Sequence, residues 1–115
     1  MKGEHMAGSY NLKRSMDQKY YFNLVADNNE IVLTSETYNT KQNTLDGISS
    51  VRLNSPHEER YKRKISTRQL HYFILTATNG EPIGTSEEYS SAQAMENGIL
   101  VVKRIGQSAI LRDLT

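Results

Sequence analysis

Apolar and polar residues alternate in two stretches of the chain that lie 51 residues apart. The first stretch runs from Tyr20 to Ala26 and the second from His71 to Ala77. Phe, Leu and Ala recur at the same alternate positions of both, so each stretch predicts a strand with one buried face. Weaker alternation predicts four flanking strands, over residues 10–14, 31–35, 61–65 and 82–86.

Polar pairs at the ends of the two main strands predict tight hairpins. Asn28-Asn29 follows the first strand and Asn79-Gly80 follows the second. Asn and Gly both tolerate positive φ, which the favoured two-residue hairpin turn requires at both of its positions. We therefore expect a two-residue turn in each copy.

Beyond the returning strands the period of the apolar positions becomes helical. Asn39 and Ser90 each stand three positions before a Gln, which is typical of a capping box at a helix start. A short apolar segment, residues 109–111, then predicts a last strand. The apolar residues that predict the two helices are Leu45, Ile48 and Val51 in the first, and Met95, Ile99, Val102 and Ile105 in the second.

The two halves of this pattern are copies of each other. Residues 10–55 align with residues 61–106 without a gap and share 18 identities over 46 positions, which indicates a duplicated unit of about 50 residues. A unit of that size barely supports a core of its own, so we expect the copies to share one. The sequence predicts a single α+β domain, residues 7–115. In it, repeat 1 (about 9–59) and repeat 2 (about 60–115) form one mainly antiparallel sheet with two helices packed on one face.

The composition argues against several classes of protein. The net charge of +1 provides no global field that would gather nucleic acid or anionic lipid. The chain has no cysteine, and no apolar run approaches the roughly 18 residues that span a membrane. We therefore expect a cytoplasmic protein without a cofactor. Residues 1–6 have no counterpart in the second repeat, and we expect them to be a disordered leader, native or added.

Repeated polar residues after the returning strands could carry chemistry. A pseudo-twofold axis could bring Glu36 and Glu87 together as paired carboxylates for acid–base work or cation binding. The simpler interpretation is a turn residue near a helix start, where negative charge is favoured. We expect the neighbouring Thr and Ser side chains to stabilise the same strand-to-helix corner, and Tyr38 and Tyr89 to pack into it.

Other candidate residues favour structural explanations. Gly47 and Gly98 are expected in mid-helix, where Gly costs about 1 kcal/mol relative to Ala, so they predict close packing of each helix against a neighbouring strand. The three histidines are not repeated and lack the spacing of metal ligands. We expect no catalytic residue and no metal site, and we do not expect an enzyme.

The repeated motif resembles that of the YegP-like family, small bacterial proteins of tandem repeats whose function is not assigned. The resemblance covers about residues 7–115 and implies two β₃-α-β units that build one sheet and exchange their terminal strands. Asn29 stands where the family usually has Gly, and Pro82 where it usually has an aliphatic residue. The residues that carry the resemblance are Asn28, Glu30, Thr34, Ser35, Glu36, Tyr38, Gly47, Ile48 and Val51, with Asn79, Glu81, Thr85, Ser86, Glu87, Tyr89, Gly98, Ile99 and Val102 in the second copy.

One set of residues suggests a binding function. If the Phe and Leu residues of the main strands face the helices, alternation places aromatic, aliphatic and cationic side chains on the opposite face. This set consists of Lys13, Tyr21, Lys62, Lys64, Tyr72 and Ile74. Such a mixture occurs on sheets that bind single-stranded nucleic acid, although Tyr is also favoured in strands for packing alone.

Three interpretations of this face stay open: a solvated surface, a protein contact and a nucleic-acid site. We expect a monomeric, non-enzymatic interaction domain that presents the face to another macromolecule, most readily a protein. Single-stranded nucleic-acid binding is the alternative.

Overall fold

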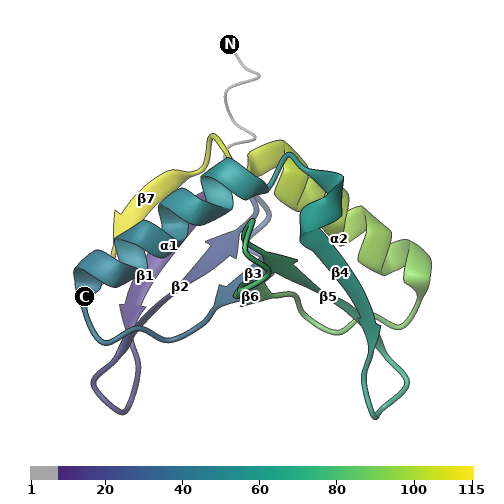
Figure 1. Ribbon diagram of the computed structural model, residues 1–115, viewed down its shortest axis with the longest axis horizontal. Helices are drawn as coiled ribbons and strands as arrows, with labels where there is room; N and C mark the ends of the chain where they lie inside the picture. The colour runs from purple at the N-terminus through teal and green to yellow at the C-terminus, as the bar shows by residue number, and fades with distance from the viewer. Residues whose placement is uncertain (1–7) are drawn as a thin grey trace.

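The computed structural model describes residues 8–115, and the expected leader, residues 1–6, lies outside the described residues. Its strands and helices follow the order expected from the hydrophobic pattern (Figure 1). Pro82, which lacks a backbone N–H, begins its strand, where no ladder hydrogen bond is lost. In chain order the elements are β1 (Ser9–Arg14), β2 (Tyr20–Val25), β3 (Ile31–Ser35), α1 (Lys41–Asn54), the 3₁₀ turn η2 (Glu58–Arg60), β4 (Tyr61–Ile65), β5 (His71–Thr76), β6 (Pro82–Thr85), α2 (Ala92–Ile105) and β7 (Ile110–Asp113).

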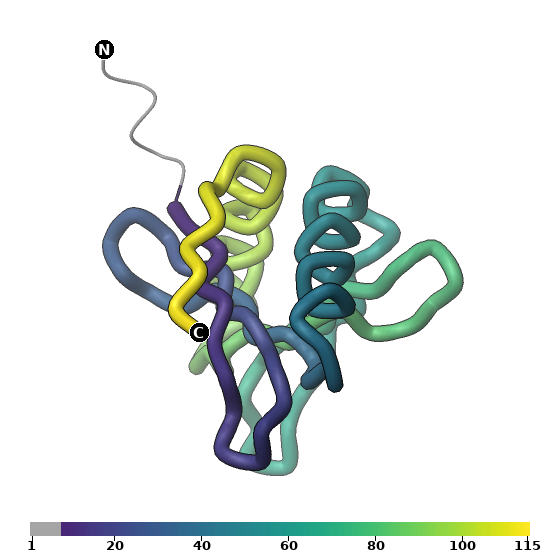
Figure 2. The backbone as a smooth tube through the Cα atoms, turned by 90° about the vertical axis from the view of Figure 1, so that its left-hand side faces the viewer, coloured from purple at the N-terminus to yellow at the C-terminus, as the bar shows by residue number. Residues whose placement is uncertain are grey.

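The strands form one seven-stranded sheet in the order β4-β5-β6-β3-β2-β1-β7. All neighbours are antiparallel except β1 and β7, which are parallel. Both helices cover the same face, and the sheet arches beneath them (Figure 1). The β1–β2 and β4–β5 hairpins extend away from the helices on either side of the arch (Figures 1 and 2). The α+β fold predicted from the sequence is confirmed.

One terminal strand crosses between the repeats. β7 follows α2 but pairs with β1 of repeat 1, in a register that sets Ser9 opposite Ile110 and Leu12 opposite Asp113. After α1 the chain instead enters β4 itself, so repeat 1 has no residues left for a counterpart of β7. Within residues 8–115, β4 pairs with β5 alone. The exchange implied by the family resemblance therefore runs in one direction.

A pseudo-twofold axis passes between β3 and β6. Thr34 lies directly opposite Thr85, its equivalent 51 residues later. Beside this pair, a Cβ added at Gly84 would lie only 2.9 Å from Cγ of Leu33, which is the equivalent of Gly84. The axis has room for one leucine side chain only, and Leu33 of repeat 1 occupies it while repeat 2 has Gly84.

The same arrangement recurs where the two helices end. Ser55 and Gly106 are equivalent residues, and a Cβ at Gly106 would collide with the Ser55 side chain. Buried tyrosines satisfy the carbonyl groups at these ends: Tyr61 donates to the Ser55 carbonyl at 2.6 Å, and Tyr10 donates to the Gly106 carbonyl. Burial raises the pKa of both tyrosines above the ordinary range.

The helix starts differ from the predicted capping boxes by one residue. Thr40 and Ser91 are the N-caps, and their hydroxyls accept from the backbone N–H of Asn43 and Ala94, each at 3.0 Å. The expected caps, one position earlier, would have placed Gln at the third helical position. The glutamines instead bond side chains four residues further along each helix.

The hairpin loops also differ from the predicted two-residue turns. Only the second residue of each polar pair has positive φ, 70° at Asn29 and 87° at Gly80. Ala26 donates its backbone N–H to the carbonyl of Glu30, which encloses a three-residue loop. A register shift follows on β2 and β3, as is usual for three-residue hairpins. This bulge allows both Val32 and Leu33 to be buried.

Candidate functional site

The Ser residues of the repeated motif are committed to the strand-to-helix corners. Each hydroxyl accepts from a backbone N–H of the adjacent main strand, Ser35 from Phe22 at 2.9 Å and Ser86 from Phe73 at 3.0 Å. Each then donates to the carbonyl of the following Glu at 2.7 Å. Each hydroxyl thus donates its only proton and accepts one backbone hydrogen bond within the corner, which confirms the structural interpretation of this part of the motif.

The Tyr and Gly residues of the motif pack against each other. A Cβ at Gly47 would lie 2.6 Å from the hydroxyl oxygen of Tyr38, and a Cβ at Gly98 would lie 2.5 Å from that of Tyr89. Burial raises the pKa of both tyrosines. The expected close packing at the glycines is confirmed, although a tyrosine, more than a strand, is the close neighbour.

The register contradicts a paired-carboxylate site at Glu36 and Glu87. The backbone N–H of Glu36 donates to the carbonyl of Ile83 at 3.1 Å, two residues past the Thr34–Thr85 pair. The pseudo-twofold places Glu87 equally far past that pair in the opposite direction. Along the strand direction, Glu36 and Glu87 are therefore four extended residues apart, which corresponds to about 13 Å. The described residues hold no group of three or more His, Asp or Glu that could bind a metal ion.

The six residues predicted for the open face lie on the face away from the helices and form three cross-strand pairs. Lys13 lies opposite Tyr21, Lys64 opposite Tyr72, and Lys62 opposite Ile74. Neighbours across an antiparallel pair lie within side-chain contact distance. The register thus sets a predicted cation opposite a predicted aromatic residue in two of these pairs, which lie next to the turns of the β1–β2 and β4–β5 hairpins.

The strands β3 and β6 separate these pairs into two sets, one on each repeat. Near the middle of the face, the amide of Asn23 donates to the hydroxyl of Thr34 at 2.9 Å. On repeat 2 the face contains an open pocket of about 440 Å³, which sequence reasoning missed. Strand alternation predicted Tyr72 on this face, but no pattern in the sequence indicated a pocket beside it. The residues lining the pocket are Ser66, Thr67, Tyr72, Thr85, Ser86 and Glu88.

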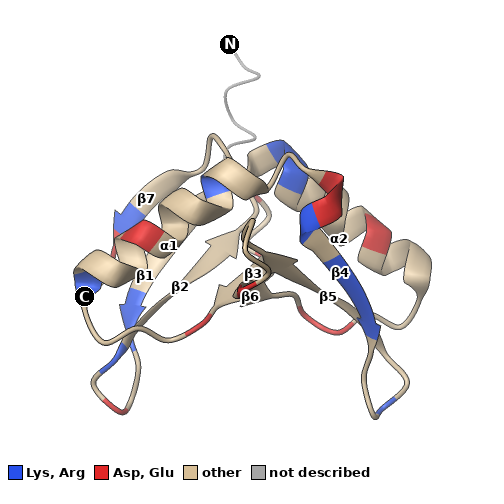
Figure 3. Cartoon of the chain, in the orientation of Figure 1, with Lys and Arg blue, Asp and Glu red and all other residues tan. Residues whose placement is uncertain are grey.

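The face is not uniformly basic. Glu88, at the pocket, forms an ion pair of 3.1 Å with Arg68 of the β4–β5 hairpin. Figure 3 shows acidic residues on the links that leave the two central strands, and basic residues on β1 and β4. Basic residues therefore lie mainly on the two flanks of the arch, with acidic residues between them.

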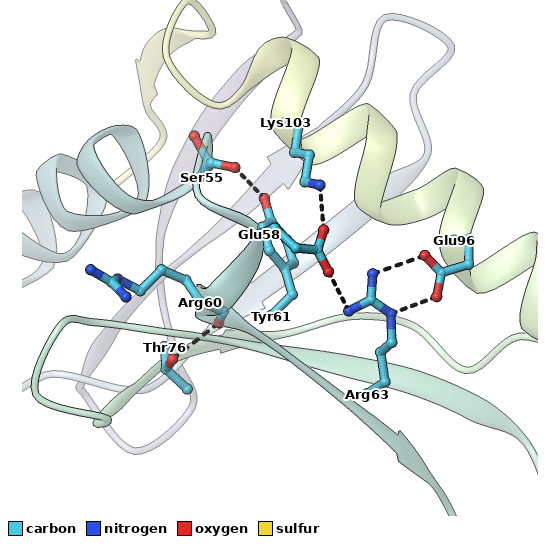
Figure 4. Close-up of polar contacts among 8 residues, drawn as sticks. All are labelled: Ser55, Glu58, Arg60, Tyr61, Arg63, Thr76, Glu96 and Lys103. Carbon is cyan, nitrogen blue, oxygen red and sulfur yellow. Dashed lines mark hydrogen bonds and ion pairs between the residues drawn. The ribbon is translucent and has the colours of Figure 1, made fainter.

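An ion-pair network lies on the helix side of β4 (Figure 4). Arg63 contacts both oxygens of Glu96, at 2.5 and 2.9 Å, and reaches Glu58 at 2.7 Å. Lys103 lies 2.5 Å from the other oxygen of Glu58. Hydrogen bonds from Arg63 and Lys103 lower the pKa of Glu58 to about 2. No local sequence pattern predicts this network, because its members come from three separate elements.

The network predicts a pH dependence of stability. A carboxyl group whose pKa is lowered by folding stabilises the protein above its ordinary pKa, 4.5, and loses that effect as pH falls towards 2. Glu58 is largely exposed, so we expect Glu58→Gln to lower the free energy of unfolding at pH 7 by less than about 1 kcal/mol. Urea unfolding at pH 7 and pH 2 checks this. The difference should be much smaller at pH 2, where Glu58 is about half protonated. Glu59→Gln is the control, because the Glu59 side chain is exposed and lies 3.7 Å from Arg60.

In the part of the chain that the structure describes, no helix is long and apolar enough to cross a membrane.

Comparison with known proteins identifies relatives over almost the whole chain. A family model described as a domain of unknown function, DUF1508, matches residues 15–61 and 68–113. The UPF0339 protein YegP of Yersinia pestis is 45% identical over 94% of this chain and 96% of its own length. YegP of Escherichia coli K12 is 46% identical over 96% of this chain and its entire length.

Solved structures of relatives have the same fold. The solution NMR structure of YegP from E. coli, described as a protein of unknown function, matches with a TM-score of 0.90 at 45% identity, over 96% of this chain and 95% of that one. The solution structure of UPF0339 protein SO3888 from Shewanella oneidensis matches with a TM-score of 0.89 at 43% identity, over 96% and 93%. With two repeats matched and identity sustained over nearly the full length, the chain belongs to the DUF1508 family, the family of the UPF0339 YegP proteins.

Proposed function

We propose that this protein is a non-enzymatic interaction domain that binds another macromolecule, a protein, through the face of the sheet away from the helices. The observation that carries the proposal is the pairing of Lys13 with Tyr21 and of Lys64 with Tyr72 on that face. Tyrosine offers apolar area with a polar end, a combination that is enriched at protein interfaces. The helices leave this face uncovered (Figures 1 and 2).

The structural roles of the repeated motif residues support a binding function over a catalytic one. Its Ser, Tyr and Gly residues are used in the corners and in packing, and its Glu residues are separated by the sheet register. We infer that the protein acts without a cofactor, as a monomer, in the cytoplasm.

The alternative function is binding of single-stranded nucleic acid by the same face. The two Lys–Tyr pairs favour it, because bases stack on aromatic rings and phosphates pair with neighbouring cations. The acidic residues between the flanks weaken it, since they would repel a backbone crossing the arch.

An amide chemical-shift titration separates the two functions. Isotope-labelled protein is mixed with single-stranded RNA and DNA oligonucleotides at low and near-physiological salt. Shifts at Tyr21, Tyr72 and Lys64 that weaken steeply with salt would favour nucleic acid. We expect no such shifts.

A pull-down then tests the protein contact itself. A specific partner should be retained by the wild type and lost by the double variant Tyr21→Ala/Tyr72→Ala. Leu100→Ala is the matched control, because it removes an exposed apolar side chain from the helix side. A partner retained equally by all three proteins would contradict the proposal.

A further inference from the structure

The free edge of β4 corresponds to an edge that is occupied elsewhere in the same molecule. β4 and β1 are equivalent strands, since Tyr10 and Tyr61 lie 51 residues apart and cap the helix ends in the same manner. On β1 the outer edge is paired with β7, whereas in residues 8–115 the outer edge of β4 has no neighbouring strand. The molecule thus contains one filled and one open version of the same edge.

The filled edge shows which backbone groups of β4 face outwards. The carbonyl of Gly8 accepts from Ile110 at 3.3 Å, and that of Leu12 accepts from Leu114 at 2.9 Å. The equivalent of Leu12 is Arg63, so the backbone groups of Arg63 point to the open edge. The equivalent of Gly8 lies within η2, so an added strand would begin its pairing at Tyr61. The open edge therefore offers five residues, Tyr61–Ile65.

The side chains of the open edge are more basic than those of the filled one. Lys62, Arg63 and Lys64 replace Asn11, Leu12 and Lys13. Alternation places the two lysines on the face away from the helices and Arg63 on the helix side, and all three are exposed. A strand lying along this edge would meet the two lysines on the face away from the helices, whereas on the helix side Glu58 and Glu96 balance the charge of Arg63.

We propose that the edge of β4 binds an acidic, extended segment of a partner protein, which pairs parallel to β4 in the position that β7 occupies on β1. Main-chain hydrogen bonds would supply affinity, and a carboxylate opposite Lys62, on the face away from the helices, would supply specificity. This inference shares Lys62 and Lys64 with the proposed open face, but it depends on the backbone groups at the edge of β4 and not on the two tyrosines.

The charge pattern selects an acidic partner over a second copy of this chain. Another β4 would set lysines and arginine against the same residues, and like charges directly opposite are destabilising. β7 from another molecule would set Arg112 opposite Lys62 and Asp113 opposite Arg63 in the equivalent register, so one unfavourable and one favourable charge pair would offset each other. On the helix side Glu58 and Glu96 flank Arg63, which disfavours a phosphate backbone.

The internal strand supplies a probe for this edge. A peptide of residues 108–115 carrying the change Arg112→Glu, with blocked ends, keeps the β7 pattern and places a carboxylate opposite Lys62. The unchanged peptide is the control. Amide hydrogen exchange of the free protein should be fast at Arg63 and slow at Leu12, whose edge is paired. Adding the changed peptide should slow exchange at Arg63, and it should bind at least about fivefold more tightly than the unchanged peptide.

A pair of variants separates backbone pairing from charge attraction. Arg63→Leu copies the residue found on β1 and keeps the edge-facing N–H, whereas Arg63→Pro also removes that N–H. We expect Arg63→Leu to retain most binding and Arg63→Pro to lose at least about tenfold more. If Arg63→Pro does not fold, the exchange rate at Arg63 in the wild type decides by itself.

Several results would overturn the inference. The first is an unchanged amide exchange rate at Arg63 in the presence of saturating peptide. The second is equal affinity of the changed and unchanged peptides. The third is a change of exchange rate confined to β1, which would mean that the peptide displaces β7. Concentration-dependent self-association through β4 would assign the edge to a second copy instead. Tyr21→Ala/Tyr72→Ala should leave peptide binding unchanged, so failure of the open-face proposal and failure of the edge proposal are distinguishable.

Discussion

Exchanging Leu33 and Gly84 should restore much of the stability that either substitution alone removes. Leu33→Gly empties a fully buried site and should cost about 3–5 kcal/mol, from the cavity and the added freedom of Gly in a strand. Gly84→Leu forces a side chain into Cγ of Leu33 at 2.9 Å, an overlap that should cost at least about 2–3 kcal/mol. The double variant places one leucine at the axis again, now from the other repeat.

Chemical unfolding of the wild type, both single variants and the double variant measures this coupling. We expect the double variant to be at least about 2 kcal/mol more stable than the sum of the single effects, because the two sites share one space. Strictly additive losses in the free energy of unfolding would contradict this, because they would mean that a leucine at position 84 cannot fill the space left by Leu33. Leu53→Gly, on the exposed side of α1, controls for the general cost of introducing Gly.

A chain ending at residue 60 should not fold. Cutting there removes β6 from β3, β7 from β1 and α2 from its contacts with β3. It also removes Tyr61, whose hydroxyl satisfies the carbonyl at the end of α1. The half chain would have about 50 ordered residues and less than half of a shared core, which does not offset the loss of chain entropy.

Circular dichroism and the dispersion of amide resonances check this on residues 1–60 and 61–115 separately. We expect both halves to be largely unfolded and an equimolar mixture to recover native dispersion, because every lost contact is then available between the two chains. A folded, monomeric first half would contradict the shared core.

Most of the fold could be predicted from the sequence because its signals are local and repeated. The alternation around Phe22 and Phe73 identified the central strands, and the helical period after them identified both helices. The exact N-cap residues of the helices and the length of the hairpin loops were not predicted correctly, because they depend on the local backbone conformation. Thr40 and Asn39 are both good caps, and only the course of the chain decides between them.

Features that depend on distant pairing could not be read from local patterns. Glu36 and Glu87 are equivalent residues near an axis, yet the antiparallel register of β3 and β6 carries them to opposite ends of the pair. The network of Glu58, Arg63 and Lys103 joins residues up to 45 positions apart and has no counterpart in repeat 1. By contrast, strand alternation alone assigned the lysines and tyrosines to one face, although it did not indicate which of them lie opposite each other.

The unequal residues at the axis limit how such a chain can change by recombination. Two copies of repeat 1 joined in tandem would set leucine against leucine at the β3–β6 pair and serine against serine at the helix ends. Two copies of repeat 2 would set glycine against glycine at both places and leave the space empty. Although the halves share an ancestor, neither can now replace the other. Gene conversion between them would erase this complementarity between unequal residues.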